Sequence, residues 1–192
     1  MSAAPKHRDK IVHAAALLFR RKGYAATGMN DIVTLSGAPK GSVYHYFPEG
    51  KEQIAIETIQ YAAGLVAGTL TELAHAHASP SDMVRAYGKL LRGWLAKSEF
   101  QDGCPITTTL LELSASSEPV AEAGRNAFAS WKRIYQDKLV AASLSEPEAA
   151  SLAAMAITSF QGALIMTKVE RSAQPIIDVV EGITALFDAA LG

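Results

Sequence analysis

Apolar residues recur along most of this chain at the three-to-four-residue spacing of a helix with one buried face. The spacing is clear from Ile11 to Phe19, where Gly23 ends the first helix, and again from about Lys51 to His77. Further helices are expected over residues 81–98, 104–115, 118–143, 147–170 and 174–191. No stretch shows the alternation of a strand. The pattern predicts an all-α protein of about nine helices.

The stretch from Thr27 to Glu52 differs from this pattern because its helices are short. Asp31 opens the first of them, and Gly37 breaks it by supplying the positive φ of a sharp turn. Pro39 suits the first position of the next helix, where its missing N–H has no partner to lose. Two short helices joined by a glycine turn predict a helix-turn-helix, whose second helix enters the major groove of DNA.

The charge distribution supports that prediction. Residues 1–51 hold eight Lys/Arg against three Asp/Glu, whereas residues 52–192 hold ten against sixteen. A net charge of −1 therefore hides a basic amino-terminal part, which is the footprint of nucleic-acid binding. A hydrophobic content of 49% with 19% charged residues indicates a folded, globular chain.

These residues resemble the hallmark string of the TetR family of bacterial transcription regulators. The matching positions are Gly23-Tyr24, Thr27, Asp31-Ile32, Gly37 to Phe47 and Lys51-Glu52. The resemblance spans about residues 6 to 55, and the wording around Gly103-Cys104-Pro105 is most similar to the LmrA/YxaF-type branch. Three departures stand out: Pro39 replaces a serine, Gly28 replaces a threonine or serine, and 48–50 is one residue longer than usual.

The resemblance implies a helix-turn-helix domain over residues 1–50 and a ligand-binding and dimerisation domain over 51–192. It implies a homodimeric regulator, most often a repressor, which a small molecule releases from a palindromic double-stranded operator. Dimerisation is also expected on physical grounds, because a single reading helix contacts few base pairs.

The expected DNA contacts lie on and around the second short helix. Lys40, Tyr44 and Lys51 can donate to phosphate oxygens, and the resemblance adds His45. Gly41 permits a close approach to the bases, and Ser42 can bond to several of them. The resemblance also places the backbone amides of Thr27 and Gly28 against a phosphate, at the amino end of the preceding helix.

The last two helices are the expected dimer surface, since both carry wide apolar stripes. One stripe comprises Leu152, Met155, Ala156, Ser159, Phe160, Ala163 and Met166, and the other comprises Ile176, Val179, Val180, Ile183, Leu186, Phe187 and Ala190. An ordinary monomeric core is the alternative interpretation of the same stripes.

The middle helices are expected to hold a pocket for an apolar or aromatic effector, because aromatic walls with a few polar anchors are typical of small-molecule sites. The candidates are Trp94, Phe100, Cys104, Thr107, Thr108, Leu111, Phe128, Trp131, Tyr135 and Phe160. Glu112, the only charge between Gly103 and Ser117, is an alternative partner for a cationic ligand.

Other functions have weaker support. Cys104 lies near a helix start that would lower its thiol pKa, so a small thiol-dependent enzyme or a redox sensor is the alternative function. We expect no metal site, because His75 and His77 point to different sides of a helix. We also expect no catalytic site and no cofactor, because the sequence contains no phosphate loop, nucleotide fingerprint or catalytic triad order.

The uncharged stretch from Ala149 to Thr167 approaches the length of a membrane span, but its polar residues and alanines favour a buried helix. The apolar stretch before Arg20 is short and interrupted, unlike a signal peptide. We expect a cytoplasmic protein.

Overall fold

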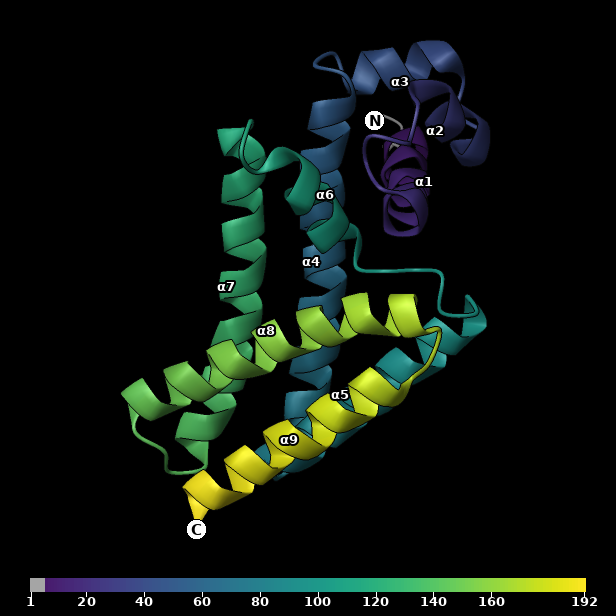
Figure 1. Ribbon diagram of the computed structural model, residues 1–192. Helices are drawn as coiled ribbons and strands as arrows, with labels where there is room; N and C mark the ends of the chain where they lie inside the picture. Colours follow the sequence, from purple (N-terminus) through teal and green to yellow (C-terminus); the bar gives the residue numbers. More distant parts are fainter. Residues whose placement is uncertain (1–5) are drawn as a thin grey trace. The chain divides into compact units, whose positions relative to one another are not determined.

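The computed structural model describes residues 6–192, and every regular element in that range is an α-helix (Figure 1). The helices are α1 (Lys6–Lys22), α2 (Met29–Ser36), α3 (Lys40–Tyr46), α4 (Lys51–Ala76), α5 (Pro80–Lys97), α6 (Pro105–Leu113), α7 (Glu118–Ala141), α8 (Glu146–Glu170) and α9 (Gln174–Leu191). The all-α prediction is therefore confirmed.

The helices form two compact units. Among the described residues, the first unit comprises 6–64 and 104–127, and the second comprises 65–103 and 128–192. This grouping differs from the division at residue 50 expected from the sequence, because α6 packs on α1 and so joins the amino-terminal helices. The helices α4 and α7 each begin in the first unit and end in the second.

The first unit has its own apolar core. Phe19 of α1, Ile32 of α2 and Val43 of α3 are fully buried together with Phe47, which ends α3. Burying one side chain of this size contributes about 1.5–3 kcal/mol. Leu113 of α6 packs against the same cluster. The core thus fixes α3 against α1 and α2 through one face.

The second unit is built around α5, α8 and α9, which pack along one another. The ring of Tyr87 on α5 meets that of Phe160 on α8 edge to face, with centroids 5.1 Å apart. The helices α5 and α9 approach closely at Gly88, where an added Cβ would lie 2.3 Å from Cγ2 of Val180. A glycine is therefore needed at this crossing.

The helix α8 is apolar on two faces. By length and composition it could span a membrane, with a mean hydropathy of 1.5 over its most apolar window. One face, which includes Ala156, Phe160 and Ala163, is buried in the second unit, so α8 serves as a core helix. The opposite face leaves Met155 and Met166 exposed.

The expected dimer stripes therefore divide between core and surface. Ala156, Phe160, Ala163, Ile176, Ile183 and Phe187 are buried within the chain, whereas Met155, Met166, Leu186 and Ala190 are exposed. Helical periodicity alone did not separate these two faces, because apolar residues occupy both.

Replacing Gly88 with alanine is expected to destabilise the second unit by about 1–3 kcal/mol, because the new methyl group overlaps Val180. Gly93 provides a matched control on the same helix, since nothing lies within 4 Å of its added Cβ. Gly93→Ala should raise stability by about 0.5–1 kcal/mol through helix propensity. Urea unfolding of both variants measures the difference, and equal midpoints would contradict the proposed close approach.

Candidate nucleic-acid interface and effector groove

The turn before α3 is set by local chemistry. Gly37 adopts a left-handed φ of 62° and closes α2 through a bond from its N–H to the carbonyl of Val33. The hydroxyl of Ser36 accepts a bond from the N–H of Ala38 at 3.2 Å. Pro39 then occupies the N-cap of α3 with φ −54°. These constraints direct the chain sharply from α2 into α3, as the sequence predicted.

One face of α3 is free of the protein core. Val43 is fully buried, whereas Lys40, Gly41, Tyr44 and His45 are exposed. The Tyr44 side chain retains 49% of its accessible surface, and nothing lies within 4 Å of an added Cβ at Gly41. Ser42, at the edge of this face, is half-buried. The exposed face carries donors for phosphate next to a position with room for close approach.

Lys51 has a different environment from the one expected. Its ammonium donates to the carbonyl oxygens of Tyr24 at 3.1 Å and Thr27 at 3.0 Å. It also lies 4.0 Å from the centroid of the Tyr24 ring, within the range of a cation–π contact. Two of its three donors therefore hold the turn between α1 and α2. The sequence did not reveal these partners, because they lie more than twenty residues away.

The amides expected to meet a phosphate before α2 also have internal partners. The N–H of Thr27 donates to the carbonyl of Tyr24 at 3.0 Å, and its buried hydroxyl donates to Gly23 at 2.7 Å. The N–H of Gly28 donates to the carboxylate of Asp31 at 2.9 Å. Asp31 thus supplies the anion that the start of α2 favours.

The pKa of Asp31 is lowered for a clear reason. The Lys22 ammonium, 2.7 Å from its carboxylate, and the Gly28 amide hold the Asp31 pKa below its usual value. Because the folded pKa is depressed, the associated stabilisation is present above the unfolded pKa and is lost as pH falls through the folded pKa. Both side chains are substantially exposed, so the contribution to stability is small.

The ten residues expected to line the effector pocket lie in both units. Cys104, Thr107, Thr108 and Leu111 belong to α6 and its N-cap in the first unit, whereas the other six belong to the second. The Thr108 hydroxyl donates to the carbonyl of Phe19 at 3.0 Å, and Leu111 is 76% exposed. Thr108 therefore has a structural role within the first unit, and Leu111 lies on its surface.

Three of the remaining candidates are core residues of the second unit. Trp131, Tyr135 and Phe160 are at most 1% exposed. The ring of Phe128 meets Trp131 edge to face at 5.4 Å. Burial, and secondarily the neighbouring Tyr87, raises the pKa of the Tyr135 hydroxyl well above its usual value. That hydroxyl has no hydrogen-bond partner among the described residues.

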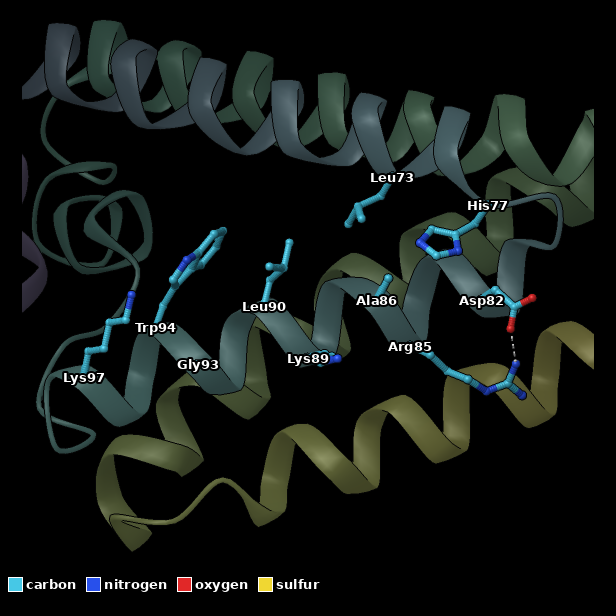
Figure 2. A pocket seen from close by; sticks show the side chains of 10 residues that line it. All are labelled: Leu73, His77, Asp82, Arg85, Ala86, Lys89, Leu90, Gly93, Trp94 and Lys97. Carbon is cyan, nitrogen blue, oxygen red and sulfur yellow. Dashed lines mark hydrogen bonds and ion pairs between the residues drawn. The ribbon is translucent and has the colours of Figure 1, made fainter.

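A groove of ≈ 700 Å³ lies in the second unit along one side of α5 (Figure 2). Leu73 of α4 faces Leu90 and Trp94 of α5 across it, and Trp94 is 45% exposed. The cationic residues Arg85, Lys89 and Lys97 also line this groove, which has His77 and Asp82 at one end.

Of the ten sequence candidates, only Trp94 lines this groove. The sequence did contain a signal for it, because Ala86, Leu90 and Trp94 recur every fourth residue and so share one helix face. Phe100 lines a second groove, between α5 and α9, and adopts a positive φ of 60° at the end of α5.

Cys104 does not have the properties of an activated thiol. It forms the N-cap of α6, but burial raises its pKa, and this effect exceeds the opposing hydrogen bonds from Thr107 and Ile106. The expectation that the helix start lowers this pKa is wrong, because desolvation of the thiolate outweighs the helix terminus. A protonated thiol is a poor nucleophile.

The fold and the exposed face of α3 define a helix-turn-helix DNA-binding protein. Residues 11–58 match the family described as bacterial regulatory proteins, tetR family, and residues 80–182 match the LmrA/YxaF-like C-terminal domain of transcriptional regulators. The chain belongs to the TetR family of transcriptional regulators and is not an enzyme. The resemblance stated from the sequence is confirmed for both the family and the branch.

Individual relatives agree with this assignment. The chain is 31% identical to the transcriptional regulator YxaF of Bacillus subtilis, over 97% of each chain. It is 32% identical to the regulator LmrA of the same organism, over 90% of this chain and 92% of LmrA. The crystal structure of a regulatory protein TetR from Rhodobacter sphaeroides superposes with a TM-score of 0.83 at 22% identity, over 92% of this chain and 96% of that one.

Proposed function

We propose that this regulator is a cytoplasmic homodimer that represses transcription and is released from a palindromic operator by a small molecule. The exposed face of α3 opposite its buried Val43 is the observation that carries the proposal. A helix anchored on one side and free on the other is suited to the major groove. Its family membership supports DNA binding as the activity of this face.

We assign the DNA contacts by chemistry. Lys40, Tyr44 and His45 donate to phosphates and set the register of α3 without reading sequence. Gly41 and Ser42 approach the base edges at the amino end of the helix. Lys51 instead supports the turn before α2, which ends at the backbone of Gly28.

Lys40→Ala is expected to weaken binding to a duplex selected by the wild-type protein from a random-sequence pool. The slope of log K against log salt should fall by about one unit, because one phosphate contact is lost. Lys10→Ala is the matched control, since Lys10 is an exposed lysine of α1. A salt slope unchanged in a folded Lys40→Ala protein would remove Lys40 from the interface.

The proposed dimer uses the exposed faces of α8 and α9. Met155, Ile165, Met166 and Val169 form an apolar strip on α8, with Val169 73% exposed, and Leu186 extends the apolar surface onto α9. Large apolar patches on a soluble protein mark interaction sites. Two copies would bury these strips and place two reading helices on one operator.

The dimer test uses these exposed residues, because Phe160 and Ile183 are part of the core. Met166→Glu and Leu186→Glu should each give folded monomers, since an unpaired charge in a desolvated interface costs several kcal/mol. Leu111→Glu, on an exposed leucine of the first unit, is the control. Light scattering that finds wild-type dimers in both test variants would place the interface elsewhere.

The effector is proposed to occupy the groove along α5. Leu73, Leu90 and Trp94 offer an apolar surface, and Lys89 and Lys97 favour a ligand with an anionic group. The third cation, Arg85, is paired with Asp82 and Asp188. This refines the apolar or aromatic effector expected from the sequence. Such a ligand can release DNA only if it binds the free and operator-bound states with different affinities.

The matched probes 1-naphthoate and 1-naphthamide test this groove, because they share one ring system and differ in charge. Naphthoate should bind more tightly and quench the exposed Trp94, whereas Trp131 is buried. Lys89→Ala should reduce the preference for the anion by about tenfold. Equal affinity for both probes, or quenching retained in Trp94→Phe, would argue against this site.

A further inference from the structure

The turn between α1 and α2 is held by a carboxylate from α6. Oε1 of Glu112 accepts the N–H of Tyr24 at 3.0 Å, and Oε2 accepts the N–H of Ala25 at 2.5 Å. Glu112 is 87 residues beyond Ala25 in the chain. A single carboxylate thus satisfies two successive backbone amides of the turn, which is a charge-assisted arrangement.

The same turn is held by a positive charge from α4. The Lys51 ammonium binds the carbonyl oxygens of Tyr24 and Thr27, while Glu112 binds the amides of Tyr24 and Ala25. Donors and acceptors of the turn are therefore paired with opposite charges from two different helices. These partners replace the regular backbone bonds that a turn lacks.

The geometry at Gly23 shows how closely the carboxylate approaches. An added Cβ at this position would lie 2.4 Å from Oε1 of Glu112, and Gly23 has a positive φ of 85°. Real side chains do not approach so closely, so Gly23 leaves the space that the carboxylate occupies. The neighbouring contacts of α6, from Thr108 to the Phe19 carbonyl and from Leu113 to the core, seat the helix on the same region.

We propose that Glu112 is a positioning residue for DNA binding, through which α6 sets the turn that leads into α2 and α3. The turn ends at Gly28, the N-cap of α2, so a displaced turn shifts the start of the helix-turn-helix. The inference rests on the proposed α3 interface and adds a residue outside the family's amino-terminal match, which ends at residue 58.

The position of α6 in the chain makes this contact suited to regulation. The chain enters α6 from residues 65–103 of the second unit, and α7 continues into residues 128–141 of that unit. Glu112 is exposed, so water can replace its partners when α6 shifts, and breaking the contact leaves no buried unpaired charge. The Glu112 carboxylate is thus a releasable contact and serves the protein's own backbone instead of a cationic ligand.

The first experiment compares Glu112→Gln and Glu112→Ala with Glu122→Gln, which removes the same charge from an exposed site on α7. Hydrogen exchange of the Tyr24 and Ala25 amides reports the contact directly. Gel shifts measure the ratio of affinities for the selected duplex and for a scrambled duplex. In Glu112→Ala both amides should exchange faster, and the ratio should fall by about fivefold to tenfold.

Glu112→Gln should give a smaller decrease, because its single amide oxygen still accepts, and Glu122→Gln should leave the ratio unchanged. A loss of stability alone would lower both affinities together through the folded fraction and would not change their ratio. If the amides exchange faster while the ratio holds, Glu112 has only a structural role and the proposal is wrong. If Lys40→Ala also leaves binding unchanged, the α3 interface itself has failed instead.

A double-mutant cycle with Gly23→Ala keeps the proposal testable if Glu112→Ala folds poorly. The methyl group overlaps the carboxylate only when Glu112 is present, whereas the strain from the positive φ remains in both backgrounds. Gly23→Ala should therefore lower the affinity ratio more in wild type than in Glu112→Ser or Glu112→Ala, whose short side chains do not reach Gly23. Equal decreases in all backgrounds would show that the two positions are not coupled and would overturn the proposal.

Discussion

The rest of the first unit depends on the burial of one side of α3. Val43 and Phe47 lie in a core shared with Phe19 of α1 and Ile32 of α2. A helix of seven residues is too short to be stable alone, so this packing supplies its stability. The same burial orients the opposite side, with Lys40 and Tyr44, toward solvent. The anchoring of α3 and the exposure of its proposed DNA-binding face therefore both follow from one packing arrangement.

Polar contacts stabilise the first unit in addition to its apolar core. The turn between α1 and α2 lacks regular backbone pairing, and its amides and carbonyls find charged partners in Glu112 and Lys51. Asp31 performs a similar role at the start of α2. Ionic side chains thus hold the parts of the helix-turn-helix that hydrophobic packing does not reach. Because Glu112 is exposed, it can release its partners at little cost, whereas Lys51 is half-buried.

The second unit differs from the first because one of its helices, α8, is apolar on two faces. Its inner face meets α5 and α9 through Phe160, and its outer face leaves Met155, Met166 and Val169 in solvent. The groove along α5 combines apolar and cationic side chains. The packing of this unit therefore buries one apolar face of α8 and leaves another exposed to solvent.

The sequence by itself determined the helical class and the helix-turn-helix. These depend on local spacing and on residues such as Gly37 and Pro39, whose backbone preferences act over a few positions. The resemblance to the TetR family rested on the same part of the sequence. Helical periodicity also located most helix boundaries to within a few residues.

Only the tertiary structure decided which residues each side chain contacts. Lys51 and Thr27 were expected at DNA, but the fold turns both toward the α1–α2 turn. Trp131 and Tyr135 were expected in a pocket and lie in the core, while Trp94 alone among the candidates lines the α5 groove. Periodicity shows that a helix face is apolar, but which neighbour covers that face depends on contacts between residues far apart in the chain.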